Sequence, residues 1–205
     1  MLGKSHLACG VSSAVIIGSG LAALSTRYVG PLSSQISYVL NGYVYPYLSG
    51  YGTFPYVVWW GMSLFLFITG LLLPDIDSKT SILGRYVHIP LEHRTWTHTA
   101  WIAIFIGIGA VFYPFLFWLV SGYVCHVFWD AISYGGVCWF YPISKYRNYG
   151  DGAKVKVNHK IKIYRTGKTS EAVVVTITVM TALGVVFACA ITGVYLDFWR
   201  MLIKG

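Results

Sequence analysis

Charged side chains are scarce in this sequence. Asp, Glu, Lys and Arg make up 11% of the 205 residues, whereas a soluble domain carries roughly 25%. Only 7 residues are acidic, while 56% are hydrophobic and 17% are aromatic. This balance excludes an ordinary soluble domain and indicates one polytopic membrane domain over residues 1–205. The fold class that we expect is an all-α bundle of about five transmembrane helices.

Cysteine pairs with CxxC spacing are absent, and we expect no cleavable signal peptide. Only Lys4 and His6 precede the first apolar run, and no clear small-residue cleavage site follows it. The cysteines lie in or beside apolar runs, which predicts packed thiols instead of disulfides or thiolate metal ligands. They are Cys9, Cys125, Cys138 and Cys189.

Apolar runs dominate what the chain does contain. We expect membrane spans at residues 7–24, 55–73, 97–112, 115–132 and 169–195. One continuous helix over residues 97–132 would be too long to cross a hydrocarbon core roughly 30 Å thick. Pro114 therefore predicts a tight hairpin between the third and fourth spans. Residues 28–53 form a tyrosine-rich connection of the kind found at membrane interfaces.

Basic residues account for a net charge of +8 and crowd into residues 145–168. In a soluble protein, such a cluster would indicate nucleic-acid binding. Beside membrane spans it follows the positive-inside rule, so we expect a basic cytoplasmic loop over residues 145–169 and no specific nucleic-acid partner. Within this loop, residues 155–164 alternate apolar and basic side chains, which favours a short strand or hairpin arm.

Potential metal ligands are concentrated between the second and third apolar runs. Pro74 ends the preceding helix and places Asp75 and Asp77 in a turn. Thr97 suits the cap of the next helix, which puts His98 in its first turn. An acidic helix end is therefore predicted to face a histidine-bearing helix start. The same stretch also holds His88, Glu92 and His93.

The alternating direction of the spans brings further ligands to the same membrane face. The first span starts beside His6, and the fourth ends beside His126 and Asp130, which share a helix face because they are four residues apart. Most cations lie on this side too, so the positive-inside rule assigns it to the cytoplasm. A charged group at mid-membrane costs on the order of 2.5–3.5 kcal/mol, which a bound cation or a substrate would offset.

Imidazole and carboxylate without thiolate suit zinc, manganese or iron in a hydrolytic site. The candidates outnumber the ~4 ligands of one tetrahedral zinc. We therefore expect either two or more ions, or that some candidates do not bind metal and instead hydrogen-bond the residues that do. Two ions can hold an attacking hydroxide and stabilise a phosphoryl leaving group. The candidate ligands are His6, Asp75, Asp77, His93, His98, His126 and Asp130.

The remaining polar residues near these ligands fit a role in the site and an ordinary structural role alike. The planar guanidinium of Arg94 suits a phosphate or carboxylate of a substrate, and equally an interfacial side chain that reaches lipid headgroups. His88 and His159 fit ordinary loop and strand positions, and Glu92 fits a supporting acid. Glu171 fits the first turn of the fifth helix, where a negative charge is favourable.

Four motifs follow one another along the chain: KSHLACG at residues 4–10, LLPDID at 72–77, HRTWTH at 93–98 and HVFWD at 126–130. With the Gly–Gly break that follows and YRTGKTSE at residues 164–171, this series resembles the YdjM-type membrane-bound metal-dependent hydrolases. Thr99 stands where serine usually follows the HRxxTH element, a change that keeps the hydroxyl.

The resemblance implies a membrane-bound metal-dependent hydrolase, distantly similar to zinc-dependent phospholipase C and its single-strand nuclease relatives. It implies phosphoester hydrolysis, and we expect membrane lipid as a partner. Asp77 and His93 would be ligands or the base that activates water, and Arg94 would hold the phosphate. The metal ligands that the resemblance implies are His6, Asp75, His98, His126 and Asp130.

Two other hypotheses use the same residues. A metal-ion or proton transporter would also place histidine and aspartate on membrane helices, but near the middle of the membrane. A non-catalytic scaffold would hold a structural metal in a closed, fully ligated site, whereas catalysis needs an open coordination position.

Overall fold

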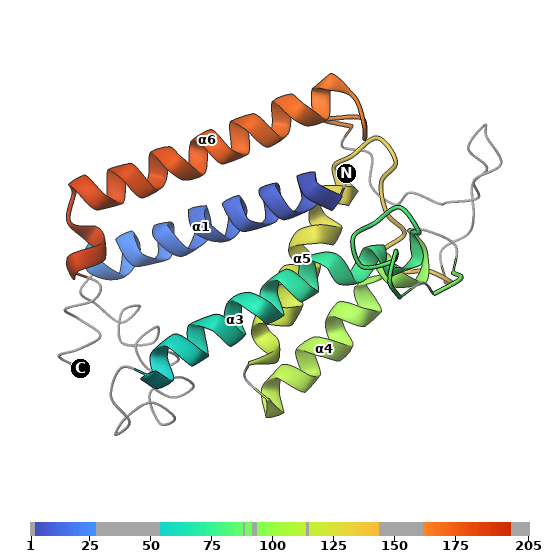
Figure 1. Cartoon of the computed structure of the whole chain (residues 1–205), viewed down its shortest axis with the longest axis horizontal. Helices are drawn as coiled ribbons and strands as arrows, with labels where there is room; N and C mark the ends of the chain where they lie inside the picture. Colours follow the sequence, from blue (N-terminus) through green and yellow to red (C-terminus); the bar gives the residue numbers. More distant parts are fainter. Residues whose placement is uncertain are drawn as a thin grey trace. The chain divides into compact units, whose positions relative to one another are not determined.

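The computed structural model describes residues 3–27, 54–87, 89–91, 94–113, 115–143 and 162–197. These residues form helices and loops without a strand, apart from an isolated backbone bridge between Ser133 and Tyr164. The all-α prediction is therefore confirmed for this part of the chain. The elements in order are α1 (Gly3–Arg27), α3 (Phe54–Leu72), the 3-10 helices η2 (Leu73–Asp77) and η3 (Trp96–His98), α4 (Ala100–Phe112), α5 (Leu116–Ala131) and α6 (Thr169–Ile191) (Figure 1).

One helix in the described part of the chain is long and apolar enough to cross a membrane, namely α6 with 23 residues. The shorter α4 and α5 have 13 and 16 residues. At ~1.5 Å per residue they reach only about 20 and 24 Å, against a hydrocarbon core of roughly 30 Å. Five complete spans are therefore not confirmed. The tyrosine-rich connection and most of the basic loop, including its predicted hairpin arm, lie outside the described residues.

Contacts within the chain define two compact units, which cut across α1, α3 and α6. The first comprises Met1–Gly10 with Met62–Thr176, and the second comprises Val11–Gly61 with Ile177–Gly205. The first unit carries all the ligand motifs. That the whole chain forms one membrane domain, with the basic loop inside it, stays a prediction.

Within the second unit, α1 contacts the last part of α6 and the residues that follow it. Ala22 and Cys189 pack with Val194 in a buried cluster. The Ser19 and Tyr195 hydroxyls lie 2.7 Å apart in a hydrogen bond. Small residues allow helix backbones to approach closely, which is how membrane helices associate without a hydrophobic driving force.

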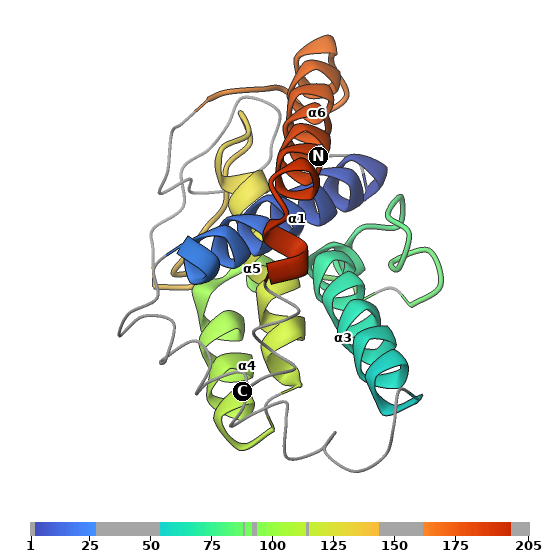
Figure 2. The ribbon, with the colours of Figure 1, turned by 90° about the vertical axis from the view of Figure 1, so that its left-hand side faces the viewer.

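Within the first unit, α4 and α5 lie side by side as a helical hairpin (Figures 1 and 2). The hairpin packs against α3 through two glycines. A Cβ atom at Gly70 would lie 2.1 Å from the carbonyl oxygen of Leu119, and one at Gly122 would lie 2.1 Å from that of Phe67. Only glycine permits this approach of α3 to α5, and it brings the end of α3 against the ligand-bearing part of α5.

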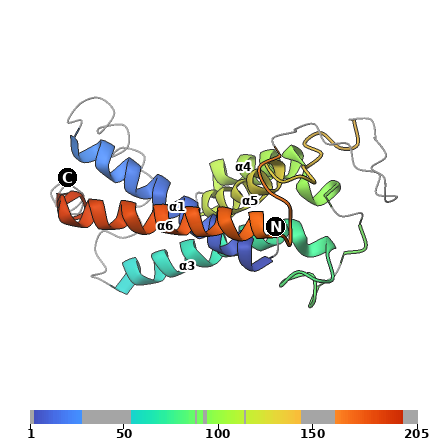
Figure 3. The same ribbon diagram turned by 90° about the horizontal axis from the view of Figure 1, so that it is seen from above.

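The buried cores of the first unit lie around the second half of α5. Tyr123, Val127 and Ala131 pack with Val137 in one cluster, and Trp129 packs with Cys9 in another. None of the four cysteines forms a disulfide, and Cys9, Cys138 and Cys189 are buried. Figure 3 shows the start of α1 and the end of α3 meeting α5 at this place, so three segments far apart in sequence meet where the candidate ligands lie.

Candidate metal centre

The segments that carry the aspartates and His98 flank helix ends, but His98 does not lie in an α-helical turn as the sequence predicts. Pro74 follows the end of α3, and Asp75 and Asp77 lie in η2, which confirms the predicted acidic turn. His98 lies in η3 and not in the first turn of α4, because Thr99 is the residue before α4 and has an extended backbone. Tyr123 explains the difference, since its hydroxyl bonds the carbonyl oxygens of Thr97 and Thr99 at 3.0 and 2.9 Å.

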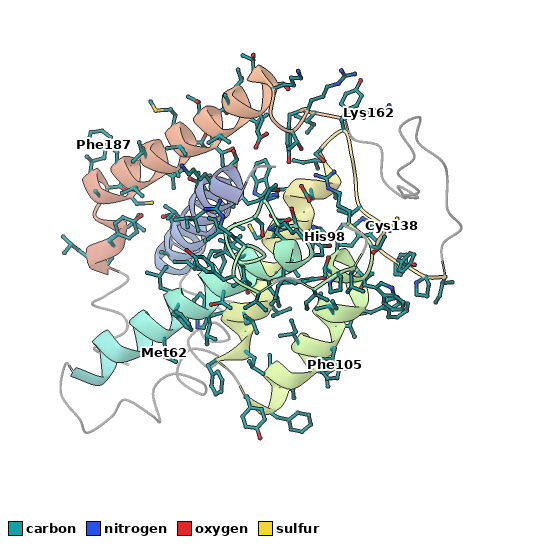
Figure 4. All side chains as sticks on the ribbon, turned by 45° about the vertical axis from the view of Figure 1, so that its right-hand side comes forward. Met62, His98, Phe105, Cys138, Lys162 and Phe187 are labelled. Atoms are coloured by element: carbon teal, nitrogen blue, oxygen red, sulfur yellow. The ribbon has the colours of Figure 1, made fainter. Side chains whose placement is uncertain are left out.

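Four of the predicted ligands converge on one point. Asp75, His98, His126 and Asp130 are buried, and each offers a ligand atom within 4.8 Å of the others. Figure 4 shows His98 among the side chains enclosed by α3 and α5. The four residues come from η2, η3 and two turns of α5, which confirms the predicted convergence of separate helix ends.

The spacing of these four atoms fits a single cation. His98 Nε2 lies 3.8 Å from Asp75 Oδ1 and 3.3 Å from Asp130 Oδ2. His126 Nε2 lies 3.5 and 3.8 Å from the same two oxygens. Ligand atoms about 2.0–2.1 Å from a tetrahedral zinc lie about 3.3–3.4 Å from one another. The observed separations approach the edges of such a tetrahedron and exceed the roughly 2.7–2.9 Å of direct charge-assisted hydrogen bonds.

Hydrogen bonds on the far side of both imidazoles orient them toward this point. His126 Nδ1 lies 2.6 Å from the carbonyl oxygen of Leu71, so it must carry the proton and donate it. Its Nε2 atom is then a lone pair, which is buried and makes no hydrogen bond. A lone pair beside two carboxylates is unfavourable without a cation or proton between them, and that arrangement fits a metal ligand.

His98 is oriented by a chain of two hydrogen bonds. The Thr97 hydroxyl donates to Asp77 Oδ2 at 2.5 Å and lies 2.9 Å from His98 Nδ1. Because its own proton goes to the carboxylate, the hydroxyl oxygen is left to accept the Nδ1 proton. His98 therefore also turns an Nε2 lone pair toward the cluster. Asp77 is not one of the four converging residues, and its place behind His98 is that of a support for a ligand.

His6 adjoins the four-residue cluster. Its ring stacks on that of His126, with centroids 3.7 Å apart, and its Nε2 atom lies 3.2 Å from Asp130 Oδ1. The side chain is buried, and neither ring nitrogen has a hydrogen bond of ordinary geometry. Asp130 thus turns Oδ2 toward His98 and His126 and Oδ1 toward His6. His6 is therefore in position to bind a cation held by the other four residues, or to help hold a second cation.

Arg94 is bound to the cluster from the outside. Its guanidinium lies 3.1 Å from Asp130 Oδ1 and donates to the Ser133 hydroxyl at 3.4 Å. A Cβ atom at Gly135 would lie 1.8 Å from the guanidinium, so glycine leaves the space that it fills. Arg94 also has a left-handed backbone with φ 64°, a conformation that costs free energy and tends to occur at functional sites. Both of these partners, Asp130 and Ser133, belong to α5 or the residues just after it.

The charge state of Asp75 also fits a ligand. Burial by itself raises the pKa of this carboxyl group, but the nearby imidazoles of His126, His6 and His98 outweigh it, so its pKa is lowered overall. Asp75 consequently stays ionised at neutral pH, as a metal ligand must.

Some predicted residues lie elsewhere. His88, Glu92, His93 and His159 lie outside the described residues, so the roles assigned to them stay predictions. Glu171 lies in the first turn of α6 as expected and accepts the backbone N–H of Gly167. Sequence analysis missed Tyr123 and the supporting role of Thr97. Their spacing could have shown both, since Tyr123 lies three residues before His126 on one helix face and Thr97 adjoins His98.

Comparison with known proteins places the chain in a sequence family. The family model described as YdjM inner membrane protein matches residues 1–200. No curated protein and no solved structure matches the chain.

Proposed function

Because the chain belongs to the YdjM inner membrane protein family, we propose that it is a membrane-embedded, metal-dependent hydrolase that cleaves a phosphoester at the cytoplasmic face. The observation that carries the proposal is the buried set of Asp75, His98, His126 and Asp130 with ligand atoms within 4.8 Å of one another. An enclosed set of carboxylates and imidazoles at helix ends is costly unless a cation occupies it.

The donor set favours particular metals. Two imidazole nitrogens and two carboxylate oxygens suit zinc first, with manganese or iron as alternatives. His6 and the second oxygen of Asp130 offer further ligand atoms for an additional ion, which supports a centre of two or more ions. A divalent cation held here would supply Lewis-acid activation of water and of a phosphoryl oxygen.

The surrounding residues suit the other tasks of a hydrolase. Asp77 keeps His98 in the tautomer that binds a cation, by way of Thr97. Arg94 uses part of its five-donor guanidinium on Asp130 and Ser133, and we propose that its remaining donors bind a phosphate group of the substrate. We assign the abstraction of a proton from water to His93 or Asp77, the two residues that the motifs implicate.

The second candidate function is a metal-ion or proton transporter. It is favoured by the pairing of His126 with Asp130 on successive turns of a helix with few other polar residues, since ionisable side chains in such helices mark ion pathways. A scaffold with a structural metal would need the four ligands to close the coordination sphere completely.

The test is to purify the protein, measure its bound metals, and assay release from soluble phosphoesters and from phospholipids. We expect Asp75→Asn and His126→Ala to lose both metal and turnover, whereas Asp197→Asn, an exposed acid of the second unit, should keep both. Metal retained without turnover on any substrate class would favour the scaffold. Metal flux into liposomes that the same two substitutions abolish would favour the transporter.

A further inference from the structure

Four aromatic side chains lie on or beside the segment that carries His98, and we call Trp96, Trp101, Phe140 and Tyr141 the aromatic collar. Trp96 meets Tyr141 edge to face with ring centroids 5.1 Å apart, and Trp101 meets Phe140 with centroids 5.9 Å apart. Three of these rings are also well exposed: Trp96 is 46%, Trp101 is 43% and Phe140 is 48% exposed. The first pair therefore joins η3, and the second the first turn of α4, to the loop after α5, and both pairs still present apolar surface outward.

The collar is attached rigidly to the metal cluster. Trp96 and Trp101 lie two residues before and three residues after His98 in the sequence. The N–H of Ala100 donates to the carbonyl oxygen of Trp139 at 2.8 Å, which ties the loop bearing Phe140 and Tyr141 to the first residue of α4. Because the same short segment bears His98, the collar and the cluster must lie at nearly the same depth in a membrane.

Beyond the collar, α4 presents only apolar side chains to its surroundings. Phe105, Ile108 and Val111 are 80%, 57% and 70% exposed, and Figure 4 shows Phe105 on α4 away from the enclosed side chains around His98. No charged residue or histidine occurs in residues 99–125. Such a surface fits hydrocarbon, whereas tryptophan and tyrosine at its end fit the boundary between hydrocarbon and headgroups.

We propose that the aromatic collar lies in the headgroup layer of a phospholipid bilayer and holds the metal cluster at that depth. The partner is the bilayer itself, with α4 extending from the collar into its hydrocarbon. This placement goes beyond the proposed hydrolysis, because it would hold equally for a cluster without catalytic activity. It makes the cluster reachable from the layer that contains lipid phosphates, and it separates this chain from transporters whose sites lie near the middle of the membrane.

The depth can be measured with nitroxide spin labels on the full chain in vesicles of phosphatidylethanolamine and phosphatidylglycerol. Trp101→Cys reports the collar and Ile108→Cys reports the exposed face of α4, seven residues later. If α4 runs close to the membrane normal, the label at Ile108→Cys should lie about 10 Å deeper, at ~1.5 Å per residue. The measurement is the ratio of the collision rates of the label with oxygen and with a water-soluble nickel complex.

The parent chain, treated with the same spin label, measures the background signal from the native cysteines, three of which are buried. Phe140→Cys gives a second collar position, which keeps the test valid if Trp101→Cys does not fold. We expect both collar labels at the level of the lipid phosphates and the label at Ile108→Cys in hydrocarbon. Equal depth for collar and α4 labels, a collar near the bilayer centre, or labels at both places freely exposed to water would each overturn the proposal.

Discussion

The Nδ1 atom of His126 lies 2.6 Å from the carbonyl oxygen of Leu71. This carbonyl belongs to the last turn of α3, where helix geometry provides no hydrogen-bond partner. The His126 imidazole on α5 supplies that hydrogen bond, and the carbonyl in turn orients the imidazole. The bond exists because Gly70 and Gly122 let the two backbones approach. Helix packing and ligand orientation are therefore coupled in this protein.

The coupling predicts that Gly122→Ala impairs both stability and metal binding. The new Cβ atom would lie 2.1 Å from the Phe67 carbonyl oxygen, so α5 must move away from α3. We expect the free energy of unfolding to fall by about 1–3 kcal/mol and the metal dissociation constant to rise. The control is Gly107→Ala on α4, where a Cβ atom meets nothing within 4 Å. Thermal unfolding and metal titration would refute the coupling if both variants behaved alike.

The hydrogen bonds behind His98 predict different results for two substitutions of Thr97. Thr97→Val removes the hydroxyl that links Asp77 to His98, so the imidazole can turn or adopt the other tautomer. Loss of such a support typically costs 10–100-fold in metal affinity. Thr97→Ser keeps the hydroxyl and should bind metal nearly as well as the parent chain. Equal affinities for valine and serine, measured by competition with a chelator, would exclude this role for Thr97.

Arg94 is expected to stabilise the metal-free protein more than the metal-bound one. Arg94→Ala leaves the carboxylate of Asp130 buried without its guanidinium partner, which we expect to cost about 3 kcal/mol in the free energy of unfolding. A bound cation supplies positive charge at the same carboxylate, so added zinc should raise the melting temperature of the variant more than that of the parent. Arg85→Ala removes an exposed arginine and should change neither quantity. A uniform loss with and without zinc would contradict the prediction.

Metal binding should weaken as the pH falls, with the histidines and not Asp75 as the cause. An imidazole must lose its proton to bind a cation, and the ordinary pKa of histidine is about 6.5. The pKa of Asp75 is lowered, because His126, His6 and His98 outweigh the effect of burial, so this carboxylate stays ionised through that range. We expect the zinc dissociation constant to rise as the pH falls from about 7 to about 5, which competition with a chelator at each pH would measure. A dissociation constant that does not change over this range would show that imidazole ligation is not what holds the ion.

Sequence alone indicated that this is a membrane protein and which residues are its candidate metal ligands. The low charge and long apolar runs indicated a membrane protein, and four motifs with histidine or aspartate near predicted helix ends indicated one shared site. These inferences succeeded for Asp75, His98, His126 and Asp130 because helix direction alternates along a bundle, so the ends of separate segments return to the same place. They required no knowledge of side-chain contacts.

Only the tertiary structure decided which candidate ligands converge on one point and which residues lie behind them. Local spacing put Asp77 beside Asp75 and His98 inside α4, whereas the folded chain places Asp77 behind Thr97 and His98 in η3. The reason is that the Tyr123 hydroxyl hydrogen-bonds the carbonyl oxygens of Thr97 and Thr99, the residues on both sides of His98. Contacts between segments far apart in sequence override the local preference for a helix start, and a pattern read along one segment carries no information about them.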